Sequence, residues 1–122
     1  MIRGFEQYTA PLTEYQINVV VPRVAAILKD SRGKAHAKTN EQMRRALAAF
    51  NITVKDAEMR AVINYIRVNH IVKCVLASGN GYYVATEVNE LEEYCRSLQA
   101  RCNSITQVKL ALLDDVQGRI FL

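Results

Sequence analysis

Residues 39–70 read TNEQMRRALAAFNITVKDAEMRAVINYIRVNH, and this stretch decides the fold class. Thr39, followed by Gln42 three residues later, is a capping-box sequence that predicts the start of a helix. The apolar residues that follow have the helical spacing i, i+3, i+4 and i+7: Met43, Ala46, Leu47 and Phe50. Asn51 tolerates left-handed backbone geometry and is the expected end of this helix.

A further helix is predicted directly downstream. Thr53 is its expected cap, with Asp56 at the third helical position, and the helix is expected to run from about Val54 to Asn69. Its apolar stripe repeats the same spacing: Met59, Val62, Ile63 and Ile66. Two amphipathic helices joined by a turn of about three residues are typical of the helix-turn-helix motif.

The pattern after His70 changes from helical to extended. Residues 71–77 are rich in β-forming side chains, Gly79-Asn80-Gly81 fits a hairpin turn, and residues 82–85 provide a return strand. Tyr82 and Tyr83 point to opposite faces of that strand, so one is expected in the core and the other in solvent. The chain is therefore expected to be mainly α-helical with a small β-hairpin.

The region before this motif is predicted to hold one more helix. Thr13 with Gln16 forms a second capping box, Leu12 with Ile17 forms a hydrophobic staple, and the helix is expected to end near Asp30. Pro22 lies inside it and should kink or split it, because proline cannot donate the helical hydrogen bond. We expect residues 1–12 to be an arm without regular structure, and residues 31–38 to be a basic loop with at most a short strand at its end.

A long helix is expected over residues 86–116, followed by an unassigned tail at 117–122. Four apolar residues recur in it every seven positions, Leu91, Leu98, Ile105 and Leu112, and Tyr94, Cys95, Cys102 and Val108 broaden the stripe. Such a surplus of apolar surface favours a partner helix, most simply from a second copy in a homodimer. The alternative is that the helix folds back across the first helix.

Composition limits the classes of function. The 122 residues suit a domain of residues 13–85 plus the long helix, and no stretch approaches the ~18 apolar residues of a membrane span. MIRGFE at the N-terminus lacks the apolar core of a signal peptide, so we expect a cytoplasmic protein. The odd number of cysteines, Cys74, Cys95 and Cys102, without a secretory signal argues against a disulfide framework. They show no ligand spacing with His36 or His70, so no metal site is expected.

Charge is unevenly distributed along the chain. The net charge is +4, with twelve Lys and Arg against six Asp and Glu in residues 1–85, and four against six in residues 86–122. The body is therefore basic and the C-terminal region mildly acidic, which fits a polyanionic partner for the body. No sequence pattern of a catalytic set or nucleotide-binding loop is present, so we expect a protein without enzymatic activity or a cofactor.

The helix predicted over residues 54–69 carries the candidate DNA-reading side chains. Arg60, Asn64 and Arg67 are spaced to share one face, and Arg and Asn are the residues that read guanine and adenine in the major groove. Lys55 lies at the N-terminal turn of this helix, where such helices meet DNA. The alternative is that these side chains are simply the solvent-exposed face of an amphipathic helix. Further candidate DNA contacts are Lys34, Lys38, Arg44, Arg45, Lys73 and Asn80.

The order of helix, helix, turn, helix and hairpin over residues 13–85 resembles the winged helix-turn-helix superfamily of bacterial DNA-binding proteins. GFEQYTAPLT at 4–13, INYIRVN at 63–69 and GYYV at 81–84 also resemble small proteins of bacterial phages and integrated mobile elements. The superfamily implies that the helix over 54–69 enters the major groove and that the hairpin contacts the flanking DNA. Asp56 and Glu58 depart from the more basic composition usual in such a helix.

Two hypotheses follow for the function. The first is a DNA-binding protein of a phage or mobile element, acting in transcription control or as an accessory factor in replication or excision. The second is a winged-helix adaptor that binds proteins through its C-terminal helix, since a fold does not determine function.

Overall fold

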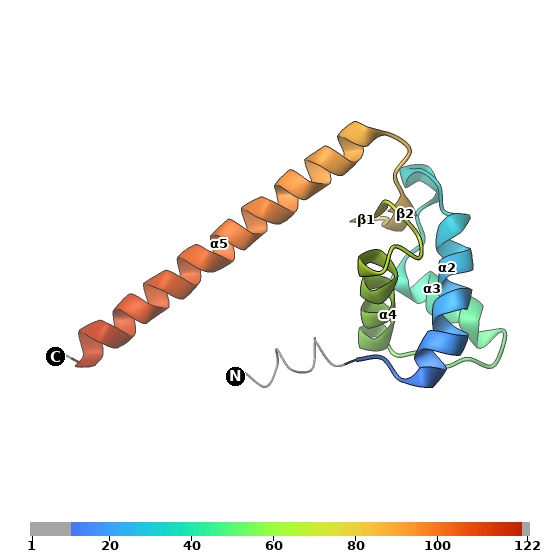
Figure 1. The fold of residues 1–122 in the computed structure, drawn as a ribbon, viewed down its shortest axis with the longest axis horizontal. Coiled ribbons are helices and arrows are strands. Elements are labelled where there is room, and N and C mark those ends of the chain that lie inside the picture. The colour runs from blue at the N-terminus through green and yellow to red at the C-terminus, as the bar shows by residue number, and fades with distance from the viewer. Residues whose placement is uncertain (1–10, 121–122) are drawn as a thin grey trace. The chain divides into compact units, whose positions relative to one another are not determined.

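The computed structural model describes residues 11–120 (Figure 1). The chain divides into two compact units, Met1–Thr86 and Glu87–Leu122, and each is described by itself. The expected arm at 1–12 lies almost wholly outside the described residues. The described chain is mainly helical, with a small two-stranded antiparallel hairpin and a long C-terminal helix, as the sequence predicts.

The first helix begins at the predicted capping box. The Thr13 amide donates to Gln16 Oε1 across 2.8 Å, and the Gln16 amide donates to Thr13 Oγ1 across 3.1 Å. A π-helical segment, η1 (Gln16–Val20), precedes α2 (Val21–Lys29), and Pro22 lies in the first turn of α2. The split expected at Pro22 is thus a change of hydrogen-bond pattern, because a proline without an N–H is tolerated at the start of an α-helix.

The second predicted helix is α3 (Asn40–Ala48), and both hydrogen bonds of the box between Thr39 and Gln42 are present. Asn51 has a φ of 61° after it, as expected for a left-handed terminating residue. Phe50 was expected in the core, but it is 59% exposed. The helix ends before Phe50. The guanidinium carbon of Arg23 lies 4.3 Å from the centroid of the Phe50 ring.

The helix α4 (Asp56–Val68) starts later than the sequence predicts. Its N-cap position is occupied by Lys55, without a side-chain cap, so the prediction that Thr53 caps this helix is wrong. The reason is tertiary: Ile52 and Val54 are 5% and 8% exposed, and an extended backbone is needed to turn both toward the core. The link between α3 and α4 is consequently longer than the short turn expected.

The hairpin consists of β1 (Val75–Ser78) and β2 (Gly81–Val84), paired antiparallel from Val75 with Val84 to Ser78 with Gly81. The strand starts later than residue 71 because Cys74 has a φ of 65°, which is outside the extended region of a regular strand. Tyr83 is buried and Tyr82 half-buried.

A third segment runs along the outer edge of the hairpin. The backbone of Lys38 exchanges two hydrogen bonds with that of Tyr82, at 2.9 and 2.8 Å, where the sequence allowed a short strand. A short 3₁₀ helix, η2 (Lys34–His36), precedes this pairing. Gly81 makes the close approach possible, because a Cβ atom there would lie 2.3 Å from the carbonyl carbon of Lys38.

The core of the first unit lies where α2, α3, α4 and the hairpin meet, and Figure 1 shows these elements gathered around it. The predicted stripe of α4 is buried: Met59, Val62, Ile63 and Ile66. Met43 and Leu47 of α3 are buried in the same cluster as Val24 and Leu28 of α2. One core thus fixes the orientation of all three helices, and with it the outward face of α4.

The second unit consists of the helix α5 (Val88–Ile120). It is 33 residues long, or about 50 Å at 1.5 Å per residue. The helix continues to Ile120, where the sequence predicted a tail from Gln117; no proline follows Val116 to stop it. Residues 121–122 of that tail lie outside the described residues. Within residues 11–120, no helix has the length and apolar content that crossing a membrane requires.

Candidate nucleic-acid interface

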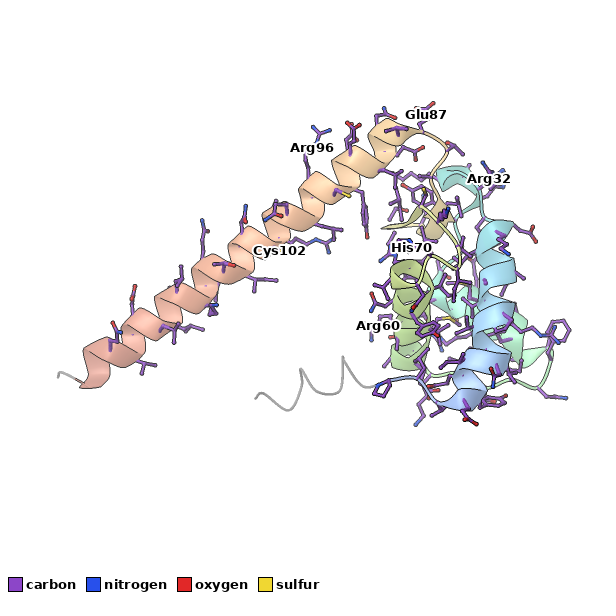
Figure 2. All side chains as sticks on the ribbon, viewed as in Figure 1. Arg32, Arg60, His70, Glu87, Arg96 and Cys102 are labelled. Atoms are coloured by element: carbon purple, nitrogen blue, oxygen red, sulfur yellow. The ribbon has the colours of Figure 1, made fainter. Side chains whose placement is uncertain are left out.

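The outward face of α4 follows from its buried stripe. With Met59 and Ile63 turned to the core, the side chains of Ala57, Arg60 and Asn64 are exposed. Figure 2 shows Arg60 on α4. Asp56 and Val68 are the other exposed residues of α4, so Arg60 and Asn64 are the exposed cation and the exposed amide of this helix. Such a helix can lie against a groove of duplex DNA, with one cation and one amide able to reach a base or a phosphate.

Arg67 does not share this face, although the sequence spacing places it there. Its side chain is half-buried, its Nε donates to the carbonyl oxygen of Val75 across 3.0 Å, and its guanidinium lies 5.8 Å from the centre of the Tyr82 ring. The predicted trio is therefore divided. Arg60 and Asn64 face outward, and Arg67 links α4 to the hairpin.

A carboxylate at the start of α4 holds two of the predicted cations. Asp56 lies 2.7 Å from Nη2 of Arg60 and 4.0 Å from Nη2 of Arg44. Asn40 completes the group, because its Nδ2 donates to the Asp56 carbonyl oxygen and its Oδ1 accepts from Arg44 Nε across 2.7 Å. These side chains are one-third to two-thirds exposed, so the ion pairs contribute little to stability.

Arg45 is paired within its own helix. Its Nη2 lies 2.6 Å from Oε1 of Glu41, and both side chains are largely exposed. Arg44 and Arg45 also line an open hollow of about 270 Å³ formed by α3 and the residues after it, Glu41, Ala48, Ile52, Thr53 and Val54. No sequence pattern predicts this hollow, because it depends on the extended path through Ile52 and Val54.

The remaining predicted contacts are mostly lysines. The ammonium groups of Lys34, Lys55 and Lys73 make no hydrogen bond or ion pair with another described residue, and all three side chains are exposed. Lys38 is half-buried, and its Nζ donates to the carbonyl oxygen of His36 across 3.1 Å. Asn80 is exposed at the tip of the hairpin.

The charge on α4 itself is of mixed sign. Asp56 and Glu58 occupy its first turn, beside Lys55 and Arg60. Glu58 is half-buried and accepts a hydrogen bond of 3.4 Å from Gln16 Nε2, so it also ties η1 to α4. The positive surplus of this unit therefore lies on residues around α4 rather than on its exposed face.

The described residues contain no group of three or more His, Cys, Asp or Glu side chains placed to hold a metal ion. Cys74, Cys95 and Cys102 are exposed free thiols. The arrangement that does emerge is a helix pair, a hairpin and a set of exposed cations. Compared with known proteins, the chain matches no family model, no curated protein and no solved structure.

Proposed function

We propose that this protein is a non-enzymatic DNA-binding protein with the architecture of a winged helix-turn-helix. In this proposal α4 enters the major groove, and Arg60 and Asn64 contact base edges. The observation that carries the proposal is the element order of the first unit: α3, α4 and an antiparallel hairpin around one core, with the outward face of α4 left open.

Phosphate contacts supply the affinity in this proposal. Lys55 precedes α4, Lys73 precedes β1 and Lys34 begins η2, so the proposed phosphate contacts come from three separate segments of the first unit. Arg44 would supply a further phosphate contact once its guanidinium moves away from Asp56. Phosphate contacts position such a protein on the duplex, and base contacts provide sequence preference.

The biological role proposed with it is that of a phage or mobile-element regulator, or an accessory factor in replication or excision. This rests on the sequence resemblance of residues 4–13, 63–69 and 81–84 alone. Selection of bound fragments from the DNA of the source genome would test it, because a regulator or excision factor enriches sites near its own element.

The test of DNA binding compares three proteins on a labelled duplex over a salt series. We expect the unmodified chain to lose affinity steeply as salt rises, and Arg60→Ala/Asn64→Ala to bind more weakly at every salt concentration. Arg96→Ala, which removes a cation from α5, is the matched control and should bind as the unmodified chain does. Equal binding by all three would place DNA away from α4, and absence of binding at low salt would overturn the proposal.

A second candidate function is a protein-binding adaptor, and a specific observation favours it. Ile105, Leu112 and Val116 of α5 are 69%, 58% and 53% exposed, whereas the exposed face of α4 carries charges of both signs. An adaptor of this kind would bind its partner protein through α5 and would not bind DNA. Loss of a captured partner in Ile105→Lys, together with no affinity for duplex DNA, would favour this function over the first.

A further inference from the structure

The helix α5 carries a continuous row of side chains with the spacing of a coiled coil. Alternate steps of three and four residues define the row, here called the seam: Val88, Leu91, Cys95, Leu98, Cys102, Ile105, Lys109 and Leu112. Val88, Leu98 and Ile105 in it are 69%, 41% and 69% exposed. Isolated helices gain little stability in water, so a helix with an exposed seam is expected to have a partner.

We propose that the seam packs antiparallel against the seam of a second copy of this chain, with Leu98 of one copy facing Cys102 of the other. This register pairs every seam position. Cys95 then faces Ile105 of the second copy, Leu91 faces Lys109, and Val88 faces Leu112. The inference does not depend on DNA binding, because it concerns the partner of α5 alone.

Side-chain volume supports the antiparallel orientation. In it, each central layer combines one cysteine with one leucine or isoleucine: Cys102 with Leu98, and Cys95 with Ile105. A parallel pair would instead stack Cys102 on Cys102 and Leu98 on Leu98. Layers of two small side chains would then alternate with layers of two large ones. Combining a large with a small side chain fills the space between the helices more evenly.

Charge supports the same orientation. Lys109 lies in the seam, so a parallel pair would bring two Lys109 ammonium groups together and would also set Glu87 beside Glu92 of the other chain. The antiparallel register places Lys109 beside Leu91 of the second copy, where the exposed carboxylate of Glu92 lies on the same side of the seam. The two Arg101 side chains meet only at the rim, where water and salt screen them.

The position of Lys109 also selects the register. A shift of one heptad would place Lys109 against Leu98 of the second copy, where the neighbouring side chain is the uncharged Gln99. The register with Leu98 facing Cys102 instead sets the carboxylate of Glu92 beside Lys109. Complementary charges specify one register over another, so the register with Leu98 facing Cys102 is preferred to the shifted one.

Disulfide cross-linking tests the orientation directly. One chain keeps only Cys102, by Cys74→Ser/Cys95→Ser. The other has Leu98→Cys with all three native cysteines changed to serine. We expect a cross-linked dimer after mild oxidation of the mixture and none from either chain alone, because facing seam positions alone come within disulfide reach. Cross-linking by either chain alone would show a parallel pair and overturn the proposal.

A second pair of variants controls for the possibility that Leu98→Cys itself weakens packing between the two helices. In it, one chain keeps only Cys95 and the other carries Ile105→Cys as its only cysteine, and the same pattern is expected. Failure of both mixtures to cross-link, or a monomer in sedimentation equilibrium of the unmodified chain at micromolar concentration, would overturn the proposal.

A charge exchange tests the register. Lys109→Glu should weaken the dimer at least about tenfold, because it sets two carboxylates together. Glu92→Lys/Lys109→Glu should restore most of that loss. Arg96→Glu makes the same charge change outside the seam and is the matched control, with little effect expected. A harmless Lys109→Glu, or a double variant no better than Lys109→Glu, would overturn the register.

Discussion

Arg67 Nε on α4 donates a hydrogen bond of 3.0 Å to the carbonyl oxygen of Val75, the first residue of β1. The guanidinium also lies over the Tyr82 ring of β2, so one side chain joins the helix to both strands. Arg67→Ala should therefore lower the free energy of unfolding by about 1–3 kcal/mol. Arg60→Ala, on the exposed face, should change it by less than about 0.5 kcal/mol. Urea denaturation of both variants measures the difference, and equal effects would refute this role of Arg67.

The two glycines of the hairpin should differ in their tolerance of a side chain. Gly81 has a φ of 116°, and a Cβ there would lie 2.3 Å from backbone atoms of Lys38. Gly81→Ala should cost about 1–3 kcal/mol, since it combines backbone strain with a collision. Gly79 has nothing within 4 Å of the equivalent position, so Gly79→Ala is the control and should be nearly neutral. Thermal unfolding distinguishes them, and a neutral Gly81→Ala would contradict the close approach of Lys38.

Two threonines that look equivalent in the sequence should behave differently. Thr39 Oγ1 accepts the Gln42 amide across 3.1 Å at the start of α3, so Thr39→Ala should cost about 1 kcal/mol. Thr53 lies before the N-cap residue of α4 and caps nothing, so Thr53→Ala should have little effect. Chemical denaturation of the pair gives the result. A larger loss for Thr53→Ala would mean that α4 begins where the sequence pattern places it.

Phe50 and Met43 were predicted to lie on one buried stripe, and the structure separates them. Met43 is 0% exposed, and Met43→Ala should cost about 2–5 kcal/mol by leaving a cavity in the core. Phe50→Ala removes an exposed ring beneath Arg23, and a cost of no more than about 1 kcal/mol is expected. Equal losses on urea denaturation would place Phe50 in the core after all.

The lysine before α4 gives a quantitative expectation for DNA binding. If Lys55 contacts one phosphate, Lys55→Ala should reduce the slope of log affinity against log salt by about 1. Lys29→Ala, at the C-terminal end of α2, removes the same charge and should leave the slope unchanged. Fluorescence anisotropy over a salt series measures both slopes. A reduced slope for Lys29→Ala with an unchanged slope for Lys55→Ala would place the phosphate contact on α2 instead.

Features that depend on neighbours in the chain were predictable from the sequence. Both capping boxes formed as expected, because Thr13 with Gln16 and Thr39 with Gln42 complete their hydrogen bonds within one turn. The buried stripe of α4 was also correct, since helical spacing alone places Met59 and Ile63 on one face.

Features that depend on distant parts of the chain were not predictable. The delayed start of α4 follows from burial of Ile52 and Val54 in a core built by other elements. The inward turn of Arg67 depends on its hydrogen bond to β1, a strand that follows α4 in the chain, and the helical spacing of α4 carries no information about that contact. The pairing of Arg60 with Asp56 has the i, i+4 spacing of a helix, and both residues lie within the helix predicted over 54–69, so this pair was open to prediction from the sequence.

The pairing of Lys38 with Tyr82 has a consequence for the order of folding. Their backbone hydrogen bonds close a loop that contains all of α3 and α4, and the entropy cost of closing a loop rises with its length. The helices form from local contacts, which assemble faster than distant ones. The hairpin should therefore dock last and detach first, so native-state hydrogen exchange at the Lys38 and Tyr82 amides should occur through openings that leave the helices intact.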